Sequence, residues 1–426
     1  MSAPFPKEKV RAVLLEGVHP RGAELLEEEG FKVEAHAKAL EGEALARAVA
    51  AAHIVGIRSK TQVRSAALER ASRLLTVGAF CIGTDQVDLK GAAHRGVPVF
   101  NSPFSNTRSV AELTIAEVVA LLRGLFEKSR KLHEGEWDKS ASGAHEVRGK
   151  TLGIVGYGHI GSQVSVLAEG LGMRVIYYDI VPKLPIGNAR AVRSLDELLA
   201  GSDVVTVHVP ETARTRGMIG KRELAKMREG ASLINNARGS VVEVPALAAA
   251  LKSGHLAGAA ADVFPREPAG KGERFESELR GLGNVILSPH IGGSTEEAQE
   301  AIAEDVATKL IRFVNNGSTT GAVNVPEVEL AEQGPRLEQG EEPPTPAQAR
   351  RAGRHHRLLH FHRNVPGVLS KVHGVIAKLG VNINAEHLQT RGDVGYVVLD
   401  VDPTEGERVL EGLRGIPETI RARMLW

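Results

Sequence analysis

Residues 151–180 read TLGIVGYGHIGSQVSVLAEGLGMRVIYYDI, and this stretch decides the fold. A short apolar run, 151–155, leads into a turn with three glycines and an amphipathic segment that continues to about Leu171. A second apolar run, 174–178, closes the stretch. Two apolar runs of strand length joined by a helical segment predict one strand–helix–strand unit of a parallel sheet.

The glycines Gly156, Gly158 and Gly161 form a GxGxxG motif. They permit, in turn, a tight turn, a close approach of backbone amides to a pyrophosphate, and close packing of the helix on the sheet. Asp179 ends the second strand, where a carboxylate accepts hydrogen bonds from ribose hydroxyls and repels a 2′-phosphate. A lone GxGxxG is often only a glycine-rich turn, but strand, helix and acid together predict a dinucleotide site that prefers NAD to NADP.

The composition excludes several classes of protein. The chain has 426 residues, too many for one ordinary domain, and is 42% hydrophobic and 25% charged with a net charge of +1. This near-neutral balance predicts neither a nucleic acid nor an anionic membrane as partner. The sequence shows no signal-peptide pattern and no apolar run of membrane-spanning length, so we expect a cytoplasmic protein. The single cysteine, Cys81, fits a reducing compartment and is favoured as a buried apolar residue rather than a nucleophile.

Residues 10–100 alternate apolar runs with amphipathic segments, which predicts a second, smaller α/β region. Strands are expected at 10–15, 31–35, 53–57, 74–77 and 97–100. Arg58-Ser59-Lys60 follows the third of them, where an open parallel sheet places its ligands, so anion binding is favoured over a solvated surface pair. Ser105-Asn106-Thr107 precedes a helix expected from Ser109, as N-cap, to about His133, and Lys139 beyond it is a further candidate for an anionic substrate group.

Four further apolar runs, 203–209, 232–234, 257–261 and 285–287, each end in a polar cluster. In a doubly wound sheet such ends line one crevice. His290 titrates near neutrality and suits proton transfer, Glu267 suits orientation of its ring, and the planar fork of Arg238 suits a substrate carboxylate. The predicted NAD cofactor implies hydride transfer, and these three side chains would serve that reaction on a hydroxy acid.

The C-terminal part has a different pattern. Residues 329–354 lose periodicity and gather Glu, Gly and Pro, which predicts a solvated linker, and 355–426 show the order βαββαβ of a ferredoxin-like sandwich. His355, His356, His360 and His362 raise the question of a metal site. No Cys or carboxylate accompanies them at ligand spacing, so no metal is predicted.

The segments GYGHIG with Asp179, HVP, NNARG, DVF followed by EP, and SPHIGG together resemble the D-isomer-specific 2-hydroxyacid dehydrogenases, in the form that carries a C-terminal ACT regulatory domain. The resemblance implies a discontinuous flavodoxin-like substrate-binding domain, 1–107 and 299–328, and a Rossmann-type NAD domain, 108–298, followed by the linker, 329–354, and the ACT domain, 355–426. It implies NAD-dependent oxidation of 3-phosphoglycerate to 3-phosphohydroxypyruvate, the first step of serine synthesis, by a homotetramer.

By matching position, the resemblance assigns catalysis to Arg238, Glu267 and His290. The implied cofactor contacts are Gly156, Gly158, His159, Ile160, Gly161, Asp179, His208, Asn236, Ala237, Arg238, Asp262, His290, Ile291, Gly292 and Gly293. The implied substrate contacts are Arg58, Ser59, Lys60, Asn106 and Lys139. The implied contacts to an inhibitory L-serine, bound between subunits, are His362, Asn364 and Asn382.

Three alternatives stay open at this stage. Another D-2-hydroxyacid, such as 2-hydroxyglutarate or glycerate, could be the substrate, although the cations Arg58, Lys60 and Lys139 favour a substrate with a second anionic end. The fold also serves NAD-responsive binding proteins, which would not need the predicted catalytic residues. Asn364 could be a structural helix cap rather than a ligand of serine.

Overall fold

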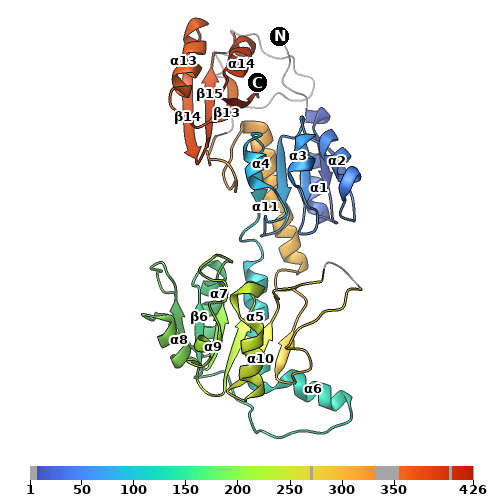
Figure 1. The fold of residues 1–426 in the computed structure, drawn as a ribbon, viewed down its shortest axis with the longest axis vertical. Helices are drawn as coiled ribbons and strands as arrows, with labels where there is room; N and C mark the ends of the chain where they lie inside the picture. Colours follow the sequence, from blue (N-terminus) through green and yellow to red (C-terminus); the bar gives the residue numbers. More distant parts are fainter. Residues whose placement is uncertain (1–6, 269–271, 332–354, 403–404, 426) are drawn as a thin grey trace. The chain divides into compact units, whose positions relative to one another are not determined.

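The computed structural model describes residues 7–268, 272–331, 355–402 and 405–425. The chain forms two compact units (Figure 1). Unit 1 comprises Met1–Pro103 and Gln299–Trp426, and unit 2 comprises Phe104–Ala298. The linker expected at 329–354 lies outside the described residues from 332 onward.

The N-terminal part of unit 1 is a five-stranded sheet, entirely parallel, in the order β2-β1-β3-β4-β5. This strand order is flavodoxin-like, in agreement with the fold that the family resemblance implied. The strands are β1 (Arg11–Leu14), β2 (Lys32–Ala35), β3 (Ile54–Ile57), β4 (Thr76–Ala79) and β5 (Val99–Asn101), and the helices are α1 (Pro20–Glu28), α2 (Gly42–Ala51), α3 (Ser65–Glu69) and α4 (Leu89–Ala93), with a 3-10 turn η1 (Lys7–Lys9). β3 and β4 are buried on both faces, which explains their nearly continuous apolar sequence.

Unit 2 is a seven-stranded parallel sheet in the order β12-β11-β10-β9-β6-β7-β8, the doubly wound Rossmann arrangement. Its strands are β6 (Thr151–Val155), β7 (Arg174–Tyr178), β8 (Arg190–Ala191), β9 (Val204–Val207), β10 (Ala231–Asn235), β11 (Leu256–Ala261) and β12 (Val285–Leu287). Its helices are α5 (Thr107–Arg123), α6 (Leu125–His133), α7 (His159–Gly170), α8 (Leu195–Gly201), α9 (Lys221–Leu224) and α10 (Val244–Lys252), with a 3-10 turn η2 (Gly239–Val241). The carboxyl ends of the central strands therefore meet at one edge of the sheet, as predicted.

The long helix before β6 differs from the expectation. It begins at Thr107 with Asn106 as the N-cap residue, so Ser109 lies inside the helix and the predicted N-cap was wrong. The expected single helix is also two helices, because Gly124 adopts a left-handed conformation (φ 58°) that ends α5 before α6 begins. Glycine reaches this conformation without the steric cost of a side chain.

The C-terminal part of unit 1 is an antiparallel sheet of four strands in the order β14-β15-β13-β16. It consists of β13 (His356–Arg363), α13 (Val368–Lys378), β14 (Ile383–Arg391), β15 (Val394–Val401), α14 (Gly406–Arg414) and β16 (Thr419–Met424), which is the predicted βαββαβ order. α13 and α14 share an apolar core with one face of this sheet. β14 is an edge strand whose side chains are mostly exposed.

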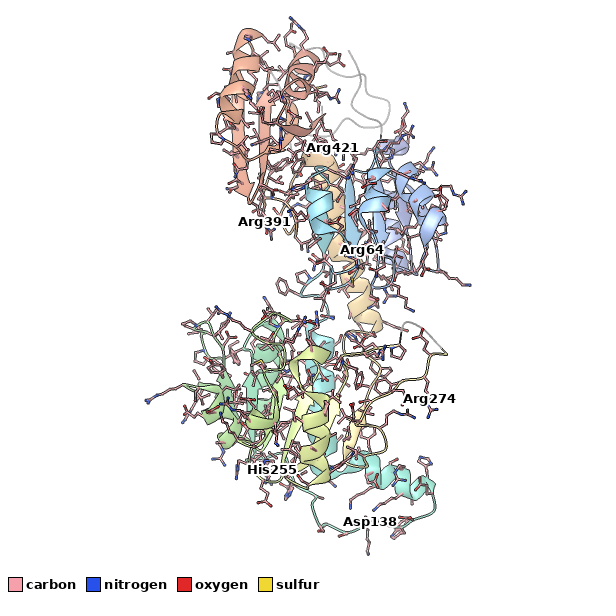
Figure 2. All side chains as sticks on the ribbon, viewed as in Figure 1. Arg64, Asp138, His255, Arg274, Arg391 and Arg421 are labelled. Carbon is pink, nitrogen blue, oxygen red and sulfur yellow. The ribbon has the colours of Figure 1, made fainter. Side chains whose placement is uncertain are left out.

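The other face of this sheet shares a core with the five-stranded sheet. Phe361 and Tyr396 stack with ring centroids 4.2 Å apart and belong to one apolar cluster with residues of α11 (Glu296–Asn316). The Tyr396 hydroxyl donates to Gly317 O at 2.7 Å. Arg421 of the C-terminal sheet, labelled in Figure 2, also donates to Leu74 O of the N-terminal part. The C-terminal sheet is thus packed on the five-stranded sheet within unit 1.

A buried ion pair belongs to the same junction. Arg357 on β13 donates to both carboxylate oxygens of Asp400 at 2.7 and 2.8 Å, and its guanidinium also donates to Asn316 O and Ala331 O. The two side chains are only 5% and 9% exposed. Each charge of this pair is compensated by the other, which is the condition under which a buried pair is tolerated.

Replacing Arg357 with Ala should lower the free energy of unfolding by about 3–5 kcal/mol, because Asp400 would stay buried without a partner. The measurement is urea denaturation followed by circular dichroism. The matched control is Arg408→Ala, which breaks the exposed pair with Glu405 and should cost less than about 1 kcal/mol. Equal, small effects of the two substitutions would show that the buried pair is not a determinant of stability.

None of the helices in the described part of the chain is both long and apolar enough to cross a membrane.

Candidate active site

The turn between β6 and α7 has the shape of a pyrophosphate cradle. Gly156 has φ +93°, and a Cβ on it would lie 2.5 Å from His208 O. A Cβ on Gly161 would lie 2.3 Å from Gly156 O, whereas one on Gly158 would meet no atom within 4 Å. α7 starts at His159 without a side-chain cap, so its first N–H groups have no side-chain acceptor. Open space above uncapped amides fits the diphosphate of NAD.

Asp179 is held beside this turn by two backbone amides. Its Oδ2 accepts from Tyr157 N at 2.8 Å and its Oδ1 from Val181 N at 2.9 Å. The carboxylate therefore has a fixed direction and retains lone pairs for ribose hydroxyls. Next to it, Ile180 and Leu184 are 79% and 87% exposed. Neither side chain was among the predicted cofactor contacts, although exposed apolar residues soon after an acidic strand end suit the face of an adenine ring.

Two further residues border the cradle. His208 is partly buried. Its Nε2 is 3.0 Å from Thr206 Oγ1, and desolvation of the ring lowers its pKa to about 3, so the ring is neutral. Its backbone carbonyl, rather than its ring, approaches Gly156. The ring of Phe104 lies 3.9 Å from that of His159 and covers one side of it, a contact that the sequence did not reveal.

The loop after β12 is organised by one buried carboxylate. Asp262 is 1% exposed and accepts hydrogen bonds from Ser288 Oγ at 2.7 Å, Ile291 N at 2.8 Å and Gly292 N at 2.7 Å. Between these anchors, His290 has φ 55°, a left-handed conformation that costs a residue with a Cβ about 1 kcal/mol. The three bonds to Asp262 hold the backbone in this conformation and so decide where the imidazole points.

His290 and Glu267 form the predicted pair. His290 Nδ1 lies 2.9 Å from Glu267 Oε2, and Glu267 Oε1 accepts from Phe264 N at 3.1 Å. The hydrogen bond to Glu267 raises the pKa of His290, against the opposing effect of burial. Burial acts to raise the pKa of Glu267, but hydrogen bonds from His290 and Phe264 outweigh it and leave that pKa lowered. Since Nδ1 is engaged, Nε2 is the nitrogen available for proton transfer.

Arg238 lies with this pair. Its positive charge acts on both His290 and Glu267. Backbone packing accounts for the closeness of Arg238 to this pair. A Cβ on Gly239 would lie 1.9 Å from the carbonyl carbon of Phe264, so the loop that carries Arg238 is packed against the loop that carries Glu267. The structure thus brings together the three residues that were predicted from three separate strand ends.

Asn106 and Gly293 also meet beside the His290 loop. A Cβ on Gly293 would lie 2.1 Å from Asn106 Nδ2, and Asn106 Oδ1 is buried without a hydrogen-bond partner among the described residues. A buried acceptor of this kind suits a ligand that donates a hydrogen bond. The substrate role predicted for Asn106 therefore remains a prediction with a free acceptor to support it.

In unit 1, the Arg58-Ser59-Lys60 loop is shaped by Glu16. The Glu16 carboxylate accepts from the backbone amides of Arg58 at 3.2 Å, Lys60 at 2.9 Å and Thr61 at 2.7 Å. Within the described ranges, neither the Arg58 nor the Lys60 side chain forms an ion pair. Glu16 was missed by sequence reasoning, because an acidic residue beyond the first strand gives no sign of the loop that it binds.

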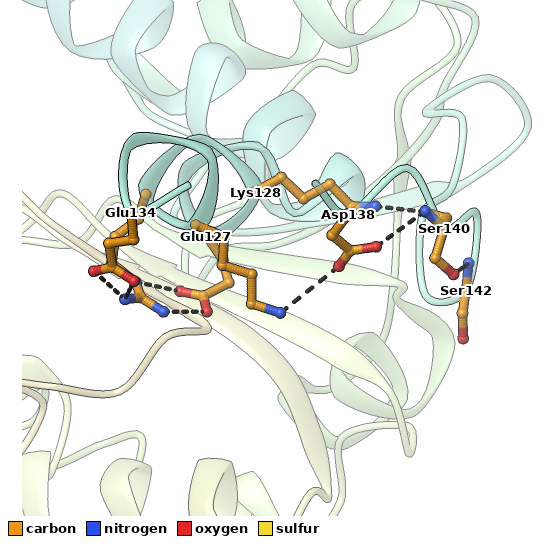
Figure 3. A network of polar contacts seen from close by, with 8 residues as sticks. Glu127, Lys128, Glu134, Asp138, Ser140 and Ser142 are labelled. Carbon is orange, nitrogen blue, oxygen red and sulfur yellow. Dashed lines mark hydrogen bonds and ion pairs between the residues drawn. The ribbon is translucent and has the colours of Figure 1, made fainter. Parts of the chain in front are cut away.

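Lys139 is not brought to the cluster of Arg238, Glu267 and His290. It is exposed in the loop that leads into the amino end of β6, the edge of the sheet opposite to the site. In this loop Asp138 pairs with Lys131 at 3.7 Å and accepts from Ser140 N at 3.0 Å (Figure 3). The substrate role of Lys139 stays a prediction.

The residues expected to bind serine lie at two opposite ends of the C-terminal sheet, with His362 and Asn364 at one end and Asn382 at the other. His362 is buried with Nδ1 unpartnered among the described residues, and the Asn364 side chain donates to Gly392 O at 3.0 Å. Asn364 does not cap α13, whose N-cap residue is Gly367. Asn382 lies at the other end of the sheet, since Ile383 pairs with Val401 while His362 pairs with Gly395. One chain therefore does not assemble all three residues.

No group of three or more His, Cys, Asp or Glu side chains with metal-binding geometry occurs in the part of the chain that the structure describes.

Comparison with known proteins identifies the family. Residues 115–292 match the NAD-binding domain of D-isomer specific 2-hydroxyacid dehydrogenases, and residues 358–421 match the AHAS small subunit-like ACT domain. The D-3-phosphoglycerate dehydrogenase of Escherichia coli (strain K12) is 50% identical over 99% of this chain and 98% of its own. The chain belongs to the D-3-phosphoglycerate dehydrogenase family, within the D-isomer-specific 2-hydroxyacid dehydrogenases.

Other D-3-phosphoglycerate dehydrogenases and solved structures agree with this. The Dictyostelium discoideum enzyme is 46% identical over 99% of this chain and 98% of its own. The structure of D-lactate dehydrogenase from Aquifex aeolicus with NAD and lactic acid is 28% identical, with a TM-score of 0.62 over 72% of this chain and 96% of that one. The chain is an NAD-dependent dehydrogenase with a C-terminal ACT domain.

Replacing Glu267 with Gln should lower the pKa of His290, because the carboxylate that stabilises the imidazolium is gone. In the native protein this pKa is raised, so the pair stabilises the fold below the ordinary imidazole pKa, and that contribution is lost as the pH rises through the raised value. NMR titration of the His290 ring measures the change. An unchanged titration would mean that Glu267 does not set the protonation of His290.

Proposed function

We propose that the chain oxidises 3-phosphoglycerate to 3-phosphohydroxypyruvate with NAD, as the first step of serine synthesis. The observation that carries this is the 2.9 Å pair of His290 and Glu267 beside Arg238, in a chain half of whose residues match enzymes named for this substrate. Bound NAD supplies the acceptor for the hydride that leaves the carbinol carbon.

The chain's own side chains supply the rest of the chemistry. His290 Nε2 accepts the hydroxyl proton as the hydride leaves, and Glu267 stabilises the imidazolium that results. Arg238 binds the carboxylate and polarises the oxygen that becomes a carbonyl. Because oxidation needs the neutral imidazole, the rate should rise with pH through the pKa of His290.

The phosphate end of the substrate needs cations that no protein group neutralises. Arg58 and Lys60 meet this requirement, since Glu16 binds only the backbone amides of their loop. A D-2-hydroxyacid without a second anion would leave both charges unused, which favours 3-phosphoglycerate over lactate-like substrates. A non-enzymatic NAD-responsive protein would not need the pairing of His290 with Glu267.

We further propose L-serine as an inhibitor bound between the ACT domains of two subunits. The support is that His362 and Asn364 lie at one end of the sheet and Asn382 at the other, with β14 free as an edge strand that a second copy can pair with. A homotetramer would need this contact and a second one elsewhere. A cytoplasmic location fits Cys81, whose thiol pKa burial raises to about 11.

The primary test is NADH formation from 3-phosphoglycerate and NAD, with His290→Ala as the key variant. Loss of the proton acceptor should lower kcat by about 10²–10⁴-fold. His133→Ala, an exposed histidine at the end of α6, should leave kcat unchanged. A wild type that is inactive on 3-phosphoglycerate but active on another D-2-hydroxyacid would overturn the substrate assignment alone.

Serine should inhibit the wild-type enzyme, and Asn364→Ala should raise the inhibitory concentration about tenfold or more, the loss expected for one hydrogen bond of about 1.4 kcal/mol to a charged ligand. Glu411→Gln on the exposed side of α14 serves as the control and should respond like the wild type. Absence of inhibition by serine in the wild type would exclude this effector.

A further inference from the structure

Glu117 is a buried carboxyl that the catalytic cluster does not include. It lies on α5, labelled in Figure 1, and is 3% exposed. This helix packs against β10, β11 and β12. Glu117 Oε2 accepts a hydrogen bond from Asn236 Nδ2 at 2.7 Å. A carboxyl group is costly to bury, so its place inside the NAD-binding domain calls for a physical reason.

Thr114 completes the contact and fixes its direction. The Thr114 hydroxyl donates to Val110 O at 2.8 Å, so toward Asn236 it can only accept. Asn236 Nδ2 lies 3.0 Å from this oxygen. Both N–H bonds of the Asn236 amide are therefore directed at α5, one to Thr114 and one to Glu117.

The two asparagines at the carboxyl end of β10, Asn235 in the strand and Asn236 directly after it, make different contacts. Asn235 shapes the loop internally, because its side chain accepts from Ala237 N at 3.2 Å and donates to Arg238 O at 3.1 Å. Asn236 instead attaches the loop to α5. The backbone that carries Arg238 is thus fixed in shape by Asn235 and in position by Asn236 and its partner Glu117.

We propose that Glu117 is a positioning residue for the dehydrogenase reaction, which through Asn236 holds the 235–238 loop and so places the Arg238 guanidinium. This proposal rests on the proposed hydride transfer but not on the identity of the substrate.

The protonation of Glu117 matters for this contact. Burial raises its pKa to about 7, the Asn236 hydrogen bond opposes this, and the Asp262 carboxylate adds to it. Of the elements packed on α5, β10 and β12 carry no titratable side chain, β11 is followed by Asp262, and α7 carries His159 and Glu169 at its ends. The charged side chains of α6, which follows α5, are Glu127, Lys128, Arg130, Lys131 and His133. Since the pKa is raised, the protonated Glu117 stabilises the fold below the ordinary carboxyl pKa, and this contribution is lost as the pH rises through about 7.

Two buried oxygens agree with a neutral carboxyl. Glu117 Oε1 and Asn236 Oδ1 both lack a hydrogen-bond partner in the described residues. Two unpaired acceptors in one buried cluster are costly, and a proton on Glu117 converts one of them into a donor.

The test compares Glu117→Gln with Glu117→Leu, using whichever 2-hydroxyacid the wild type oxidises. Gln keeps an acceptor for Asn236 Nδ2, so kcat near pH 7 should stay within about threefold of wild type. Because Gln cannot ionise, the part of the pH profile of kcat that depends on Glu117 should disappear. Leu removes the acceptor and should lower kcat about tenfold or more per folded molecule, with KM for NAD changed less. Glu112→Gln, exposed on the same helix, should change nothing.

A second readout does not depend on activity. Infrared difference spectra between wild type and Glu117→Gln should contain the carbonyl band of a protonated carboxylic acid at about pH 5, replaced by carboxylate bands at about pH 9. A wild-type kcat in Glu117→Leu, or a pH profile that is identical in Glu117→Gln and wild type, would overturn the proposal. Inactivity on 3-phosphoglycerate alone would overturn only the substrate assignment, because these comparisons hold for any substrate.

Discussion

The catalytic arrangement depends on the hydrogen bonds of one buried carboxylate, Asp262. It sits directly after β11 and accepts from three groups of the neighbouring loop, which follows β12. A side chain with a Cβ disfavours the left-handed backbone conformation of His290, and these bonds stabilise it together with the hydrogen bond from His290 N to Ser288 O at 3.0 Å. The charge of Asp262 is compensated by donors, so a group that would be costly to bury becomes the anchor of the active-site loop.

The parallel sheet of unit 2 brings the His290 loop together with the other loops of the candidate active site. The carboxyl ends of β6, β9, β10, β11 and β12 share one edge, so loops far apart in the sequence meet there. The loops after β10 and β11 touch at Gly239 and Phe264, which places Arg238 beside Glu267. The glycine turn after β6 shares this edge, so the cofactor cradle and the proton-transfer pair lie on the same side of one sheet.

The sequence predicted the parts of this fold that are encoded locally. Gly156, Gly158 and Gly161 followed by Asp179 are readable because each meets a steric or charge requirement within one strand–helix–strand unit. The end of α5 at Gly124 was missed, since a glycine inside an apolar periodic segment does not reveal its φ angle. The roles of Glu16 and Asp262 in binding loop amides could not be predicted either, because each joins segments that meet only in the folded chain.

The most direct test of the role of Asp262 is NMR of the Nδ1–H proton of His290 in the NAD-free protein at a pH where the imidazole is protonated. In the wild type we expect a strongly downfield resonance, the signature of the hydrogen bond to Glu267. In Asp262→Asn, the amide N–H groups of Asn would face the backbone donors of the loop, so we expect this resonance to disappear while the circular dichroism spectrum is retained. A downfield resonance that persists in Asp262→Asn would show that His290 reaches Glu267 without the anchor, and would contradict the central role of Asp262.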